Sequence, residues 1–156
     1  MRTQTMIRVS PVKKSIRVNA SQTRAFEVFT ARFDAWWPKT HHIGQTAMQG
    51  AVIEPRQGGR WYEKGEDGSE CQWGTVLAWE PSQRVVLSWH INSKFQYDES
   101  VASEVEVRFI AESAAVTRVE LEHRIESVDA EDIRAAVDSP GGWSSLLEHY
   151  RDVASS

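Results

Sequence analysis

Residues 140–153, the most informative stretch of the chain, read Pro-Gly-Gly-Trp-Ser-Ser-Leu-Leu-Glu-His-Tyr-Arg-Asp-Val. The apolar residues of this stretch recur at helical spacing, which predicts one apolar face on a C-terminal helix: Trp143, Leu146, Leu147, Tyr150 and Val153. Residues 48–124 instead read as short alternating strands. A helix that carries Trp and Tyr is therefore expected to pack on a sheet, an arrangement that often leaves room for a ligand.

The N-terminal third predicts one strand and one helix. Residues 1–10 show no periodicity and are expected to form a loose leader, whereas Val12 to Val18 alternates as a strand, with Lys14 as its one poor fit. Ser21 is a suitable N-cap for a helix from about Gln22 to Phe33. Further strands are predicted at residues 49–54, 59–64, 71–79, 84–91, 103–111 and 116–123, followed by a short helix at 130–137.

The composition fits one domain that spans residues 1–156 and needs no covalent or metal staple. The chain has a single cysteine, Cys71, and no apolar N-terminal run of secretory type, so we expect a cytoplasmic location. No stretch reaches the roughly 20 apolar residues that cross a bilayer. The formal net charge of −4 gives no general attraction to nucleic acid.

Five short motifs carry a resemblance to a known family. They are Gly58-Gly59-Arg60-Trp61, Trp73-Gly74-Thr75-Val76 leading to Pro81, Val85-Val86-Leu87-Ser88-Trp89, Leu121-Glu122-His123, and Gly142-Trp143 with Leu146 and Leu147. Together with the order of elements, they make residues 12–153 resemble the activator of heat-shock protein 90 ATPase homologue 1-like domains of the START-like, or SRPBCC, superfamily.

The resemblance implies an α+β helix-grip fold, in which a curved antiparallel sheet of about six or seven strands wraps around the long C-terminal helix. It also implies a hydrophobic cavity between the sheet and that helix. Chaperone activators of this family carry a further N-terminal domain that contacts the chaperone, and 156 residues are too few for both. A chaperone partner is therefore the weaker expectation.

Nine residues are candidates for a ligand site. Apolar walls with a few polar groups are typical of small-molecule pockets, and they point to Trp89, Phe109, Leu121, His123, Trp143, Leu147 and Tyr150 as the wall. The adjacent indoles of Trp36 and Trp37 are expected to gate the entrance. Ordinary core packing explains the same residues, and His123 in particular could be a hydrogen-bonded core histidine.

Other site chemistries lack their usual motifs. The histidines and Cys71 show no metal-ligand spacing, and no phosphate-binding glycine loop or nucleophile elbow is present, so we expect neither metal nor cofactor. An acid and a base could still be assembled from His123 with Glu63, Glu70 or Tyr150, because a sequence does not show which residues folding brings together.

Three functions follow as hypotheses. The first is binding of an apolar or aromatic small molecule, without chemistry of its own, by a monomer or a homodimer. The second is a co-chaperone-like protein-binding module. The third is a cyclase or dehydratase acting on a polyketide-type substrate, as in related START-like folds.

Overall fold

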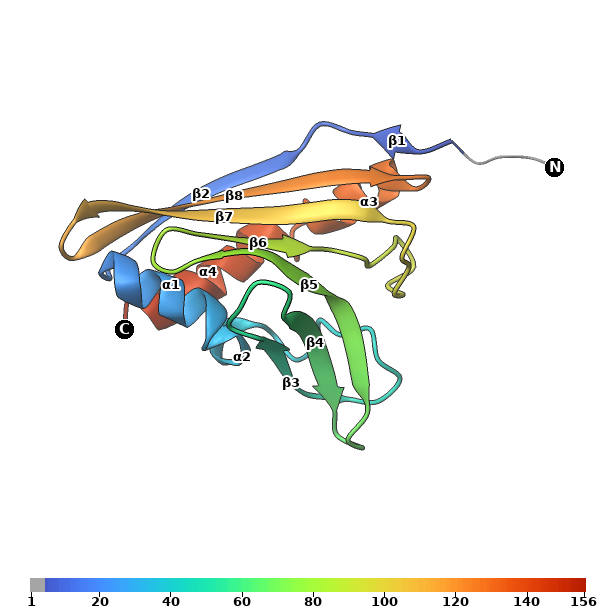
Figure 1. The fold of residues 1–156 in the computed structure, drawn as a ribbon, viewed down its shortest axis with the longest axis horizontal. Helices are drawn as coiled ribbons and strands as arrows, with labels where there is room; N and C mark the ends of the chain where they lie inside the picture. Colours follow the sequence, from blue (N-terminus) through green and yellow to red (C-terminus); the bar gives the residue numbers. More distant parts are fainter. Residues whose placement is uncertain (1–4) are drawn as a thin grey trace.

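The computed structural model describes residues 5–156 and consists of one antiparallel sheet with four helices (Figure 1). The elements in chain order are β1 (Ile7–Arg8), β2 (Val12–Val18), α1 (Gln22–Thr30), α2 (Phe33–Trp36), β3 (Met48–Ile53), β4 (Arg60–Gly65), β5 (Glu70–Glu80), β6 (Arg84–Ser88), β7 (Ala102–Ser113), β8 (Val116–Ser127), α3 (Ala130–Val137) and α4 (Trp143–Ala154).

The sheet has eight strands in the order β1-β8-β7-β6-β5-β4-β3, and β2 also pairs with β8. Figure 1 shows β7 and β8 as long strands above α1 and α4, while β5 bends downward and carries β3 and β4 with it. Register shifts in β5 against β6, and in β4 against β5, accompany this bend. The curved sheet thus wraps around α4, which confirms the predicted α+β helix-grip architecture.

The first predicted helix is wrong at its C-terminal end. The observed α1 begins at Gln22, where the Ser21 side chain accepts a hydrogen bond from the Arg24 amide, but it ends at Thr30. A second short helix, α2, follows after a break at Arg32. The break lets the Trp36 indole turn back and donate to the Val28 carbonyl at 3.1 Å, which seats Trp36 against Tyr150.

Three other predictions need correction. The leader is not wholly loose, because Ile7–Arg8 pair with the end of β8 as β1; its residues 1–4 lie outside the described residues. β6 ends at Ser88 rather than at Ile91, which makes a single bridge with Tyr97. The final strand extends four residues beyond His123, to Ser127.

Lys14 interrupts the apolar–polar alternation of β2 because its side chain forms an ion pair with a residue outside the sheet. Its ammonium group lies 2.7 Å from a carboxyl oxygen of Asp138, at the C-terminal end of α3. The side chain is partly buried, so its aliphatic stem covers apolar surface while the charged end reaches the ion pair. This contact ties the edge strand to the segment that joins α3 to α4.

No helix among residues 5–156 is long and apolar enough to cross a membrane. The core instead lies between the sheet and α1, α2 and α4, where most of the aromatic side chains gather. Phe29 and Trp36 both contact the Tyr150 ring of α4 at centroid distances of 5.2 and 5.5 Å. α4 is therefore held on its inner face by aromatic packing.

Candidate ligand pocket

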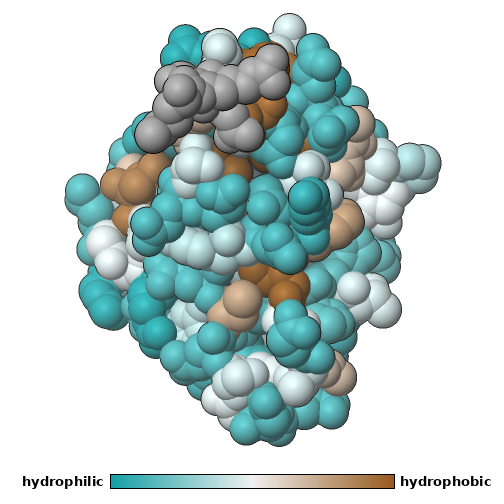
Figure 2. All heavy atoms as spheres, turned by 90° about the vertical axis from the view of Figure 1, so that its right-hand side faces the viewer, coloured by the Kyte–Doolittle hydropathy of each residue, from teal (hydrophilic) through white to brown (hydrophobic). Residues whose placement is uncertain are grey.

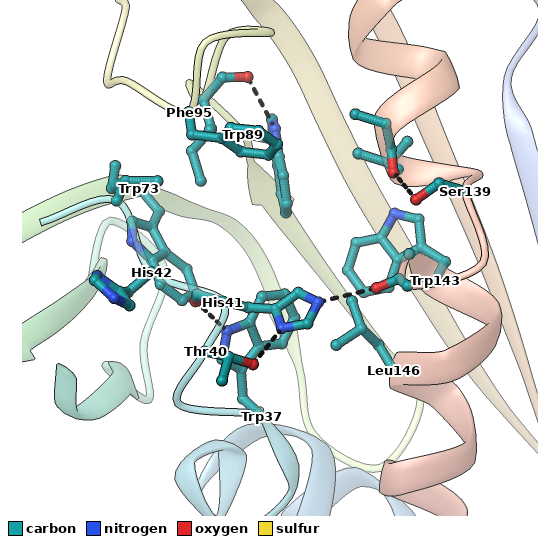
Figure 3. Close-up of a pocket in the computed structure, with 16 residues that line it drawn as sticks. Trp37, Thr40, His41, His42, Trp73, Trp89, Phe95, Ser139, Trp143 and Leu146 are labelled. Atoms are coloured by element: carbon teal, nitrogen blue, oxygen red, sulfur yellow. Dashed lines mark hydrogen bonds between the residues drawn. The ribbon is translucent and has the colours of Figure 1, made fainter. Parts of the chain in front are cut away.

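A pocket of about 430 Å³ lies at the N-terminal end of α4 (Figure 3). Three segments surround it: the connection after α2, the chain that leaves β6, and the segment from the end of α3 through the turn to the first turn of α4. One further residue comes from β5. Its lining residues are Trp37, Thr40, His41, His42, Ile43, Trp73, Trp89, Ile91, Phe95, Ala136, Val137, Ser139, Gly141, Gly142, Trp143 and Leu146.

The walls are built from four indoles, those of Trp37, Trp73, Trp89 and Trp143. Trp37 lies 5.3 Å from Trp73 and 6.1 Å from Trp143 between ring centroids, and Trp89 lies 5.9 Å from Trp143. Figure 3 shows these rings arranged around the hollow. Such an arrangement offers aromatic faces and edges to a planar ligand.

Each of the four indole N–H groups already has a partner within the protein. Trp37 donates to the His41 carbonyl at 2.9 Å, and Trp89 donates to the Ile91 carbonyl at 3.1 Å. Trp73 donates to the Glu63 carboxyl at 2.9 Å, and Trp143 donates to Nδ1 of His123 at 3.0 Å. The walls therefore present apolar surface, because their polar atoms are used elsewhere.

The polar groups of the pocket belong mainly to the connection after α2. Nε2 of His41 lies 2.9 Å from the Gly141 carbonyl, and the Thr40 hydroxyl lies 3.2 Å from Nδ1 of the same ring. A carbonyl can only accept, so Nε2 carries a proton, and in the neutral ring Nδ1 then accepts from Thr40. His41 thus bridges two segments that are far apart in sequence. His41 and His42 are the ionisable side chains of the lining.

Gly142 permits the tight turn from α3 into α4. A Cβ atom at this position would collide with the Val137 carbonyl at the end of α3. The residue directly after it, Trp143, begins α4 and enters the pocket wall. The Gly-Trp motif therefore has two parts. Glycine lets the backbone approach the end of α3 more closely than a side chain would allow, and the next residue places an indole at the start of α4.

Glu63 anchors the connection after α2 to the sheet. It lies on β4 and is almost fully buried, and it accepts hydrogen bonds from the Ile43 amide at 2.6 Å and the Gly44 amide at 3.2 Å. It also accepts the Trp73 indole N–H at 2.9 Å. One carboxyl group thus fixes both the backbone beside His42 and one wall of the pocket.

Glu63→Gln is expected to destabilise the protein by about 2 kcal/mol. The side-chain NH₂ of glutamine would replace one carboxylate oxygen, so a buried backbone N–H would face another donor and lose its acceptor. The amides of Ile43 and Gly44 should then exchange with solvent faster than in the wild type. Hydrogen exchange followed by NMR measures this, with the exposed Glu66→Gln as control. Wild-type exchange at both amides in Glu63→Gln would contradict the anchoring role.

The structure brings three of the nine predicted site residues into the pocket, namely Trp37, Trp89 and Trp143. The other six are buried in the core and do not line it: Trp36, Phe109, Leu121, His123, Leu147 and Tyr150. Sequence reasoning missed Trp73, Phe95, His41 and the α3 residues. Trp73 had a signal in its Trp-Gly motif, and the α3 residues lie in a helix that the sequence predicts without indicating a pocket beside it. His41 and Phe95 lie in loops without periodicity.

His123 lies directly behind the pocket wall. It is 0% exposed, and its Nε2 lies 2.8 Å from the Ser103 hydroxyl while Nδ1 accepts the Trp143 indole N–H. Burial, assisted by the nearby Arg124 charge, lowers the pKa of His123 to about 3. The ring is therefore a neutral core histidine that orients Trp143.

The other members of the suggested acid–base set lie apart from His123. The Tyr150 hydroxyl donates to the Ala25 carbonyl at 2.7 Å, and burial raises the pKa of this phenol. Glu63 anchors the loop, and Glu70 pairs with Arg60 at 3.0 Å near the end of the β4–β5 hairpin. The structure thus does not assemble these groups at one site.

Solved structures of similar proteins include two with substantial sequence identity. An anthrahydroquino-gamma-pyrone synthase, Txn09, complexed with SUM, is 36% identical over 94% of this chain and 97% of its own, with a TM-score of 0.62. CalC from Micromonospora echinospora, a self-sacrificing resistance protein, is 30% identical over 93% of this chain and 94% of its own, with a TM-score of 0.70.

A third structure, CalU16 from Micromonospora echinospora, is 21% identical over 97% of this chain and 82% of its own, with a TM-score of 0.64, and supports the fold alone. No curated protein matches the chain significantly. The family model described as activator of Hsp90 ATPase homolog 1-like protein matches residues 19–153. The chain therefore belongs to the family of activator of Hsp90 ATPase homologue 1-like proteins.

Proposed function

We propose that this protein binds a planar aromatic small molecule in the pocket at the N-terminal end of α4. The observation that carries the proposal is the set of four indoles around a hollow of about 430 Å³, each with its N–H satisfied inside the protein. Pockets for small organic ligands span roughly 300–1,000 Å³ and are mainly apolar, with few polar groups. The pocket fits that class.

The distribution of polar groups favours one orientation of the ligand. The indole walls offer no free donor, whereas Thr40, His41 and Ser139 lie together with the polar backbone of Gly141 among the lining residues. A ligand with a ring system and polar substituents would place its rings on the indoles, since buried polar groups need partners. Hydroxyl or carbonyl groups would then face the His41 side.

The name of one similar protein points to the same ligand class. The relative with 36% identity is named an anthrahydroquino-gamma-pyrone synthase, and an anthrahydroquinone is a flat fused ring system. This supports 1,8-dihydroxyanthraquinone as a first probe, since it combines flat fused rings with hydroxyl and carbonyl groups at one edge.

Ala136 provides a way to fill the pocket without removing packed atoms. It lies on α3, is half-buried and lines the pocket, whereas its neighbour Ala135 is exposed and does not. We expect 1,8-dihydroxyanthraquinone to quench the tryptophan fluorescence of the wild type and of Ala135→Phe with similar affinity. In Ala136→Phe the affinity should fall by at least about tenfold, equivalent to about 1.4 kcal/mol. Equal binding by the two alanine variants, or no binding by the wild type, would contradict the proposal.

Proton-transfer catalysis is a second candidate function, favoured by the His41 geometry and by the synthase name of the relative. The Gly141 carbonyl fixes the Nε2–H tautomer and leaves the Nδ1 lone pair available as a base once Thr40 turns away. The C10 methylene of 1,8-dihydroxyanthrone tests this in D₂O: Nδ1 takes a proton from C10, and a deuteron returns to the same carbon. Wild-type protein should accelerate this exchange and His41→Gln should not; equal rates would contradict the assignment.

A further inference from the structure

Phe95 is the most exposed of the large hydrophobic side chains described, at 61%, and it also lines the pocket. It lies in the connection between β6 and β7, and Figure 3 shows it with Trp89 at the upper side of the pocket. The face of the molecule at this end carries hydrophobic areas between larger hydrophilic ones (Figure 2). A single exposed aromatic needs no functional explanation, but the backbone that presents Phe95 does.

Phe95 has a φ of +59°, in the left-handed region that few residues other than glycine and asparagine adopt. It occupies a tight turn in which its amide donates to the Asn92 carbonyl at 3.0 Å, and the Asn92 amide donates to the Gln96 carbonyl at 2.9 Å. Glycine is the usual residue at the left-handed position of such turns. The local turn chemistry therefore disfavours phenylalanine here.

The turn is firmly held despite its unfavourable residue. The Asn92 side chain accepts from the Lys94 amide at 2.9 Å and from the Gln96 amide at 3.1 Å. Asp129, at the start of α3, accepts from both the amide and the hydroxyl of Ser93, at 3.0 and 2.6 Å. These bonds fix the loop relative to α3, so Phe95 has a defined position at the pocket.

We propose that Phe95 is a ligand-recognition residue that covers the exposed face of the bound aromatic ring. A strained position that the surrounding structure maintains points to function. Phe95 is solvent-exposed and lines the same pocket as the buried Trp89 and Trp143, so we infer that it lies on the solvent side of a ring bound on those walls. This inference rests on the proposed function. It names a residue that contributes to the preference for flat rings over alkyl chains, because an aromatic face stacks best on a planar partner.

Phe95→Gly tests the proposal, because glycine suits the turn while removing the ring. The affinity for 1,8-dihydroxyanthraquinone should fall about tenfold, while the melting temperature stays the same or rises. Phe95→Tyr should bind within about threefold of the wild type, because it keeps the ring. Tyr97→Ala is the matched control, since Tyr97 is exposed in the same loop and does not line the pocket; it should also bind within about threefold.

The outcomes separate this proposal from the function on which it rests. Wild-type affinity in Phe95→Gly, together with a loss in Ala136→Phe, would overturn the role of Phe95 and leave the pocket in place. An equal loss in Tyr97→Ala would also overturn it, since the effect would then belong to the loop as a whole. Absence of binding to the wild-type protein would overturn both.

Discussion

Trp143→Ala is expected to destabilise the protein by about 3–5 kcal/mol and to remove ligand binding. Trp143 is 1% exposed, forms a wall of the pocket and donates its indole N–H to His123. Truncation would therefore leave a cavity, an unpaired Nδ1 on His123 and no aromatic face at the start of α4. Urea unfolding measures the stability, and the rise in melting temperature with 1,8-dihydroxyanthraquinone measures the binding.

Leu147→Ala serves as a control that separates the loss of stability from the loss of ligand binding in Trp143→Ala. Leu147 lies on the same helix, is almost fully buried and does not line the pocket. It should cost about 2–5 kcal/mol, yet the ligand should still raise its melting temperature as in the wild type. If Leu147→Ala also lost the ligand-dependent rise in melting temperature, the loss of binding in Trp143→Ala would be explained by lower stability rather than by removal of the pocket wall.

The stability of the protein is expected to fall by about 4 kcal/mol between pH 7 and pH 3 through His123 alone. The pKa of His123 is about 3 in the folded protein, because burial and the Arg124 charge oppose protonation, whereas an unfolded histidine titrates near 6.5. Between these values the unfolded chain binds a proton that the folded protein does not. The stabilising effect is therefore complete above pH 6.5 and is lost as the pH falls toward 3.

The comparison of the wild type with His123→Gln isolates this contribution, because the carboxyl groups of the two proteins are the same. At pH 4–6 the free energy of unfolding of the wild type should change by about 1.4 kcal/mol per pH unit more than that of the variant. Urea unfolding at several pH values gives both slopes. Parallel slopes would show that His123 already takes up a proton in the folded protein.

The sequence predicts most of the fold because periodicity reports which side of an element is buried. The α4 face and the strand Val12–Val18 follow directly from apolar spacing. The short helix predicted within the connection at 130–137 is also present, as α3. The break between α1 and α2 does not follow, because it depends on a tertiary contact: the Trp36 indole reaches back to the Val28 carbonyl. β1 is not predicted for the same reason: its two residues form a strand only because they pair with β8.

The candidate site is harder to predict than the fold, because apolar residues on one face can line a core or a pocket. Trp143 and Tyr150 share the inner face of α4, yet Trp143 begins the helix beside the pocket and Tyr150 is sealed by Phe29 and Trp36. Position along the helix decides between them. His41 and Phe95 lie in irregular loops, where sequence patterns do not indicate which neighbours the backbone will meet.

The indole N–H signals of the seven tryptophans provide the most direct test of the proposed pocket. In a ¹H–¹⁵N NMR titration with 1,8-dihydroxyanthraquinone, we expect the indole signals of Trp37, Trp73, Trp89 and Trp143 to shift together with saturation. The signal of Trp79, which packs on Phe26 and does not line the pocket, should stay in place. Unchanged indole spectra, or shifts confined to tryptophans outside the pocket lining, would contradict ligand binding in this pocket.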